Sequence, residues 1–184
     1  FYLGATNSNI DQLRALDPTI TCGVKVFMGS STGNMLVDNP EALSQIFSDV
    51  TIPVATHCED EQIIRHNISE FTKKFGENIP IEYHPIIRSR EACFSSSQLA
   101  YSLAKKHNTR LHILHLSTAD EMQLLESGPV LNKQITAEVC VHHLWFSKQD
   151  YARKGAFIKW NPAIKDESDR IALFEALLDD RIDV

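Results

Sequence analysis

The sequence has no long apolar run and no strong excess of charge of one sign. None of its apolar stretches approaches the roughly 18–20 residues that a membrane-spanning helix needs, and no basic-then-apolar signal stretch opens the chain. Acidic and basic residues are interspersed, with a formal net charge of −6. This balance argues against a nucleic-acid or membrane-surface partner. An apolar share of 43% and a charged share of 23% indicate an ordinary globular domain.

The sequence has few cysteines, and their spacing matches neither a metal-binding motif nor a disulfide framework. The four cysteines contain no CxxC pair, and three of them lie on or beside predicted strands; they are Cys22, Cys58, Cys93 and Cys140. Cysteine in such places is usually a small buried apolar residue. We therefore expect a reduced, cytoplasmic protein without disulfides.

The sequence also lacks a glycine-rich phosphate loop. The polar loop from Gly29 to Asn34 is neither GxGxxG nor a P-loop with its lysine. The chain begins at Phe1 without a methionine and stops at Val184, in what reads as the start of a strand. We expect it to be a fragment of a longer protein.

Strand and helix patterns alternate along the whole chain. Apolar, β-branched runs predict five strands, at 1–4, 22–28, 52–56, 110–116 and 134–139. Between and after them, helical spacing predicts helices at 9–16, 41–47, 59–75, 90–107, 119–126, near 148–154 and at 167–178. Such alternation is typical of an α/β fold with a parallel sheet and right-handed crossovers.

A doubly wound sheet and a (β/α)8 TIM barrel both fit this alternation. The barrel is favoured because polar residues stand at the carboxyl ends of successive strands, where barrels keep their chemistry. A doubly wound site would instead concentrate at one switch point. A complete barrel takes about 250 residues, so residues 1–184 are expected to form a partial barrel domain with five or six strands.

Three residues on successive strands could build a metal centre. His57 and His115 each end an apolar strand, and Lys25 lies between apolar neighbours on a third. Neutral imidazole binds Zn, Fe, Ni or Co. The competing interpretation is that each histidine is a hydrogen-bonded residue of the rim. Strict alternation places His112 on the opposite face from His115, so His112 is interpreted as structural.

The role of Lys25 has two interpretations. A strand lysine normally extends its ammonium to water or pairs with a carboxylate. A lysine that burial deprotonates can instead take up carbon dioxide. The resulting carbamate would be an anionic ligand with two oxygens, able to bridge two cations.

Further polar residues follow the later strands. Glu138 comes at a strand end, pointing toward the same rim, and one of His142 and His143 could line the pocket while the other packs. Asn161 precedes a proline and could hold a ligand group or only shape the turn. These roles stay open.

At these residues the chain resembles the amidohydrolase superfamily, and within it the dihydroorotases. Each of five motifs is modest, but they occur in the family's order. They are GVKVFM at 23–28 for the lysine strand, THCE at 56–59, HILHLS at 112–117 for "HIxHxS", EVCVHHL at 138–144 for "EVTPHHL", and NPAIK at 161–165 for "NPPLR".

The resemblance implies a set of roles. Lys25 would bridge two divalent ions, expected to be zinc, as a carbamate. His57 and His115 would be metal ligands, and Asn161 would contact the substrate. The family's first-strand HxH pair, the substrate arginine after it and the last-strand aspartate of "DHAPH" are not found in this span. We therefore expect no catalytic general base here, and an inactive 184-residue piece.

The implied reaction is the reversible cyclisation of N-carbamoyl-L-aspartate to L-dihydroorotate in pyrimidine biosynthesis. Alternatives are a cyclic amidohydrolase of the allantoinase or hydantoinase type, an inactive dihydroorotase-like scaffold subunit, and a metal-free barrel that binds a small ligand. The expected partner is a small-molecule substrate, without nucleic acid or membrane, and a homodimer is left open.

Overall fold

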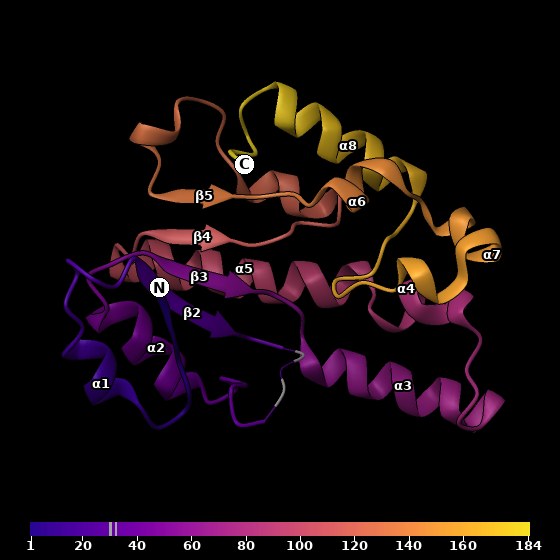
Figure 1. Ribbon diagram of the computed structural model, residues 1–184, viewed down its shortest axis with the longest axis horizontal. Coiled ribbons are helices and arrows are strands. Elements are labelled where there is room, and N and C mark those ends of the chain that lie inside the picture. Colours follow the sequence, from indigo (N-terminus) through magenta and orange to yellow (C-terminus); the bar gives the residue numbers. More distant parts are fainter. Residues whose placement is uncertain (30, 32) are drawn as a thin grey trace.

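The computed structural model describes residues 1–29, 31 and 33–184. In that part of the chain, five strands form one parallel sheet in which each strand pairs with the next along the sequence (Figure 1). They are β1 (Tyr2–Gly4), β2 (Gly23–Phe27), β3 (Val54–His57), β4 (Leu111–Ile113) and β5 (Ile135–Ala137). A doubly wound sheet would reverse its order at a switch point. The sequential order is that of a barrel wall, which confirms the predicted partial barrel.

Helices connect the strands and follow the last of them. The α-helices are α1 (Ile10–Arg14), α2 (Pro40–Asp49), α3 (Glu61–Phe75), α4 (His84–Ile87), α5 (Arg90–His107), α6 (Val141–Trp145), α7 (Tyr151–Lys154) and α8 (Glu167–Leu178). Short 3-10 turns are η1 (Ile81–Tyr83), η2 (Asp120–Leu124), η3 (Val130–Asn132), η4 (Lys148–Asp150) and η5 (Gly155–Ile158).

Local sequence signals explain where the long helices begin. The side chains of Asn39, Asp60 and Ser89 each accept a hydrogen bond from a backbone N–H in the first turn of α2, α3 and α5. These residues therefore satisfy donors that a helix start leaves free. Helix α5 is followed by Asn108, which has the left-handed conformation, with φ 56°, that suits a helix end.

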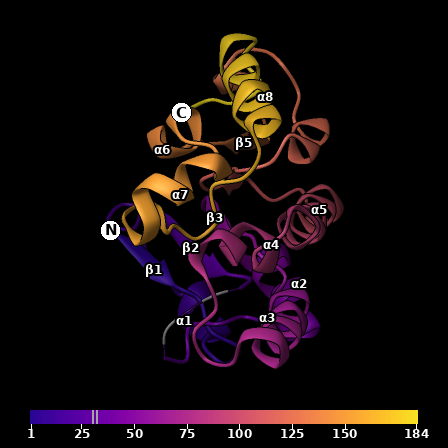
Figure 2. The same cartoon turned by 90° about the vertical axis from the view of Figure 1, so that its right-hand side faces the viewer.

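One face of the sheet is packed against helices. Alternate strand residues such as Val26, Ile113 and Ala137 are almost fully buried and share a core with Phe47 of α2 and Ala100 of α5. Figure 2 shows α2 and α5 along the same side of the sheet. The opposite sheet face, which carries Lys25, would face the interior of a barrel. Within the described residues, no helix is long and apolar enough to cross a membrane.

Several predicted elements are shorter than expected. The strand predicted at 110–116 is β4, which ends at Ile113, and the strand predicted at 134–139 is β5, which ends at Ala137. The helix predicted at 119–126 is instead the 3-10 turn η2. The predicted helices at 90–107 and 167–178 match α5 and α8. Of the predicted polar loop from Gly29 to Asn34, Ser30 and Thr32 lie outside the described residues.

The end of the chain lies beside β5 without forming a strand. Asp183 donates its backbone N–H to the carbonyl of Ala137 at 3.0 Å, and Val139 donates to the carbonyl of Val184 at 2.9 Å. Of the predicted strand start at 181–184, Asp183 and Val184 thus hydrogen-bond to the sheet edge, whereas residues 181 and 182 donate their N–H groups to the carbonyl of Ala176 in α8.

Candidate functional site

The pleat of the sheet places Lys25 and His57 on the same face. Lys25 is in register with Ala55 of β3, and Phe27 is in register with His57. Side chains two residues apart on a strand share a face. His57 therefore lies on the Lys25 face, at the carboxyl end of β3.

His115 reaches this face because the strand ends before it. The backbone of β4 stops at Ile113, and His115 has a positive φ of 42°. Such a conformation is uncommon for a residue with a side chain, and it breaks the alternation along the strand. His112 is in register with Ala55, which is itself in register with Lys25, so His112 and Lys25 lie on the same face of the sheet. The prediction that His112 and His115 face apart is thus wrong, because period-two alternation does not extend beyond Ile113.

The two strand-end histidines are in direct contact. His57 Nδ1 lies 3.0 Å from His115 Nε2, and the rings meet edge to face with centroids 4.7 Å apart. Residues 58 positions apart in the sequence thus present ring nitrogens to one point.

A buried carboxylate fixes the orientation of His57. His57 Nε2 lies 3.0 Å from Glu59 Oε2, and Arg88 Nη1 donates to the same oxygen at 2.5 Å. Burial alone would raise the pKa of Glu59, but the hydrogen bond from His57 and the charge of Arg88 lower it below its ordinary value. Because the carboxylate accepts, His57 Nε2 carries a hydrogen, which in the neutral ring leaves the lone pair on Nδ1.

His115 has the properties of a neutral metal ligand. Burial, followed by the neighbouring charges of His57 and Lys25, lowers the pKa of His115 to about 3. Its Nδ1 is buried and has no hydrogen-bond partner among the described residues. Two imidazoles on one face, one of them held by a carboxylate, are a donor set that divalent zinc accepts. The residues present therefore fit a metal centre.

Lys25 stands beside this pair in a half-buried position. Its Nζ lies 4.1 Å from the centroid of the Phe27 ring and 3.4 Å from the carbonyl oxygen of Val26. Burial lowers the pKa of Lys25 to about 8, although the charges of Cys58 and Glu138 oppose the shift. The amine is thus neutral far more often near neutral pH than that of an exposed lysine.

Glu138 joins the ends of β4 and β5. Its Oε1 accepts from the backbone N–H of His115 at 3.3 Å, and its Oε2 lies 3.3 Å from His112 Nε2. The sequence predicted that Glu138 lies at the rim, because it directly follows a strand. It did not predict the hydrogen bond from the His115 backbone to Glu138.

Asn161 lies in a loop that packs against α6. Asn161 is exposed, its bond to Pro162 is cis, and the preceding Trp160 stacks on His142 with ring centroids 4.3 Å apart. His143 Nε2 donates to the carbonyl of Pro162 at 3.1 Å. The loop therefore sits beside the histidines that follow β5.

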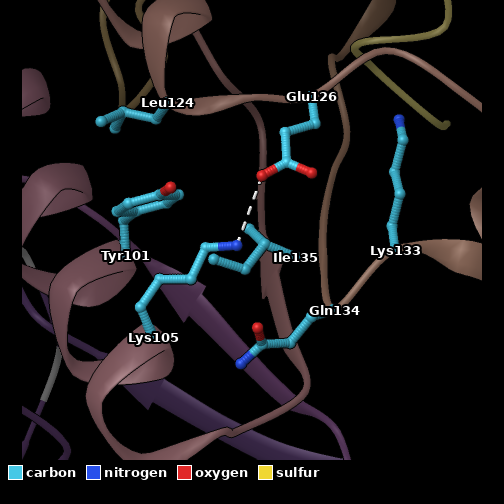
Figure 3. A pocket seen from close by; sticks show the side chains of 7 residues that line it. All are labelled: Tyr101, Lys105, Leu124, Glu126, Lys133, Gln134 and Ile135. Atoms are coloured by element: carbon cyan, nitrogen blue, oxygen red, sulfur yellow. Dashed lines mark hydrogen bonds and ion pairs between the residues drawn. The ribbon is translucent and has the colours of Figure 1, made fainter.

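A separate small pocket lies at the other end of the sheet. Figure 3 shows its lining, in which Lys105 Nζ donates to Glu126 Oε1 at 3.4 Å. Gln134 and Ile135, which also line it, stand at the amino-terminal end of β5. Barrel chemistry gathers at the carboxyl ends, so this pocket is not the candidate site.

Sequence comparison finds dihydroorotases among the relatives of this chain. The chain is 30% identical to the dihydroorotase of Methanosarcina acetivorans over 191 residues, which cover 98% of this chain and 40% of the relative. It is also 30% identical to the dihydroorotase of Lactobacillus acidophilus over 132 residues, 71% of this chain and 30% of that protein. The chain thus spans well under half the length of these curated relatives. No family model matches it.

Solved structures share the fold. The L-hydantoinase of Arthrobacter aurescens superposes with a TM-score of 0.89 at 22% identity. This match covers all of the present chain and 41% of the hydantoinase chain. The dihydroorotase of Campylobacter jejuni superposes with a TM-score of 0.61 at 17% identity. This match covers 95% of the present chain and 45% of the dihydroorotase chain. The sequence relatives confirm the predicted resemblance to dihydroorotases, and the solved structures show that the chain has the fold of part of an amidohydrolase barrel.

Proposed function

We propose that the complete protein is a metal-dependent dihydroorotase. It would interconvert L-dihydroorotate and N-carbamoyl-L-aspartate by adding water across the ring amide bond and removing it again. The first-strand HxH pair and the last-strand aspartate of the family would lie in the protein outside residues 1–184, and the aspartate would serve as the general base.

The contact between His57 and His115 is the observation that carries this proposal. His57 Nδ1 and His115 Nε2 meet at 3.0 Å at the barrel mouth, and the other ring nitrogen of His115, Nδ1, has no partner among the described residues. A buried polar atom without a partner is costly. A cation that replaced the proton shared by the two contacting nitrogens would take one lone pair from each ring, and a cation could also bind the free lone pair of His115 Nδ1.

Lys25 would complete the centre as a carbamate. With a pKa of about 8, roughly a tenth of the amine is neutral at pH 7. The neutral Nζ lone pair would form a bond to the carbon of carbon dioxide, and Nζ would lose one proton to solvent. The product carries one negative charge on two oxygens, which suits two divalent ions, proposed to be zinc.

When bound, the ions would lower the pKa of a water molecule toward about 7 and polarise the amide carbonyl. The chain's own residues would hold the parts in place. Glu59 would keep His57 in one tautomer and orientation, Glu138 would hold the turn that carries His115, and Asn161 would bind a polar group of the substrate.

A hydantoinase-type activity is the second candidate. It rests on the fold, because the Arthrobacter hydantoinase superposes with a TM-score of 0.89 and the Campylobacter dihydroorotase with 0.61. Both candidates use a cyclic amide, so the substrate separates them.

The test is turnover by the complete, metal-loaded protein. We expect it to bind about two divalent ions per chain and to hydrolyse dihydroorotate in preference to hydantoin and allantoin. Preference for hydantoin or allantoin would select the second candidate. Protein without bound metal or turnover after expression with zinc would overturn the proposal and favour the scaffold or metal-free alternative.

A variant links the activity to the proposed centre. Lys25→Ala should abolish turnover, with partial rescue by short carboxylic acids that replace the carbamate oxygens. Lys159→Ala, which removes an exposed lysine, is the matched control and should keep full activity. Turnover by Lys25→Ala at the wild-type rate would exclude a bridging role for Lys25.

A further inference from the structure

We propose that Cys140, His142 and His143 form a second metal site, for a borderline cation such as Zn²⁺, separate from the centre at His57 and His115. One donor atom from each of the three residues lies within 4.8 Å of the other two. Zinc ligands about 2.0–2.3 Å from the ion stand roughly 3.3–3.8 Å apart in a tetrahedron. Small side-chain rotations would therefore bring the three donors onto one ion.

His143 carries the strongest evidence. Only 3% of its surface is exposed, and its Nε2 donates to the carbonyl of Pro162 at 3.1 Å. Nε2 therefore bears the hydrogen, which leaves a lone pair on Nδ1. That Nδ1 is buried without a hydrogen-bond partner among the described residues. A histidine whose far nitrogen donates to a backbone carbonyl is the usual arrangement of a metal ligand.

His142 is also held in place. Its ring stacks on Trp160 at an interplanar angle of 11°, with centroids 4.3 Å apart, and lies 4.3 Å from the His143 ring. Residues on both sides of Asn161 thus orient the two imidazoles. Cys140 and His142 are partly exposed, so an ion could enter from solvent.

The donor set selects the kind of ion. One thiolate and two neutral imidazoles suit zinc and similar borderline metals, whereas Ca²⁺ and Mg²⁺ prefer oxygen ligands. Three protein ligands leave a fourth tetrahedral position for water or a small anion. Because Asn161 lies next to Trp160 and Pro162, an ion here would also stiffen the loop proposed to contact substrate.

Cobalt titration of the complete protein tests the site. Cobalt bound to a thiolate gives a sulfur-to-metal charge-transfer band in the near ultraviolet, whereas the donors proposed at the His57 centre include no cysteine. We expect the wild-type protein to show this band and to bind one cobalt more than Cys140→Ser. Cys22→Ser, which changes another cysteine with solvent access, is the control and should keep the band and the full cobalt content.

A second variant tests the same site in case Cys140→Ser does not fold. His143→Gln should lose the band and bind one cobalt less, while Lys25→Ala should keep the band even if it loses activity, so this proposal can fail separately from the proposed function. A wild-type protein that binds cobalt without the band overturns the proposal. So does a Cys140→Ser variant that keeps both the band and the full cobalt content.

Discussion

At the scale of the residue, the candidate centre depends on groups held in unfavourable surroundings. Lys25 is half-buried with a lowered pKa, and His115 combines a positive φ with a buried nitrogen that has no partner in the described part of the chain. Strain and perturbed pKa values of this kind concentrate at functional sites. Each of them should be measurable.

The lowered pKa of Lys25 predicts a pH-dependent stability. Its pKa falls from about 10.5 to about 8 on folding, so the unfolded chain binds the proton more tightly between these values. The folded state is therefore penalised below pH 8, and the penalty disappears as the pH rises toward 10.5. In metal-free protein, Lys25→Met should raise the free energy of unfolding at pH 7.5 by on the order of 1–3 kcal/mol.

Urea denaturation at two pH values checks this. The gain from Lys25→Met should shrink between pH 7.5 and pH 9.5, whereas Lys159→Met should have little effect at either. An equal gain at both values would mean that the lysine is not perturbed by folding.

Glu59 should act on the metal through His57. Glu59→Gln removes the charge that fixes the His57 tautomer and pairs with Arg88. Loss of such a partner typically weakens metal binding by about 10–100-fold. Competition with a chelator measures the change, and Glu70→Gln on the exposed face of α3 is the control. Unchanged zinc affinity would remove Glu59 from the centre.

At the scale of the element, the turn after β4 is built around one buried acid. Glu121 accepts hydrogen bonds from the hydroxyls of Ser97 and Thr118 and from the backbone N–H groups of Ser117 and Thr118. Glu121 also donates its backbone N–H to the Thr118 hydroxyl at 3.4 Å, so Thr118 and Glu121 form a capping box at the start of the 3-10 turn η2. The box fixes where the chain leaves His115.

Removing this acid should cost stability. Glu121→Ala leaves several buried donors unpaired, and each lost partner costs roughly 1–3 kcal/mol, so a total loss of about 3 kcal/mol or more is expected. Glu126→Ala, whose carboxylate is exposed and pairs with Lys105, should lose less than about 1 kcal/mol. Equal losses in urea denaturation of the two variants would show that the box contributes little.

At the scale of the whole molecule, metal binding and folding should be linked. The proposed ligands come from β2, β3 and the turn after β4, so an ion bound among them favours only the folded state. Free zinc at 100 times its dissociation constant would stabilise the protein by about 2.7 kcal/mol. Removing metal from the complete protein should therefore lower its melting temperature.

Calorimetry with added ions checks this link. Zinc should restore the melting temperature of the metal-free protein, whereas calcium, which prefers oxygen ligands, should not. A protein with His57→Ala and His115→Ala should respond much less to zinc. The same zinc response in this variant would place the stabilising ion elsewhere in the molecule.

The sequence by itself determined the strand–helix alternation, the barrel class and the extents of α5 and α8, because these follow from local spacing, caps and hydrophobic patterns. It also singled out Lys25, His57 and His115 as strand residues with polar side chains. Each of these signals lies within a few neighbouring residues, where backbone geometry repeats.

Only the tertiary structure decided which side chains meet. Alternation placed His112 and His115 on opposite faces, but β4 ends early and the positive φ of His115 turns its ring toward His57. The partners of His143 and Glu138 likewise come from other segments. Such contacts depend on register and on where each strand stops, and both are set by packing across the whole sheet rather than by local sequence.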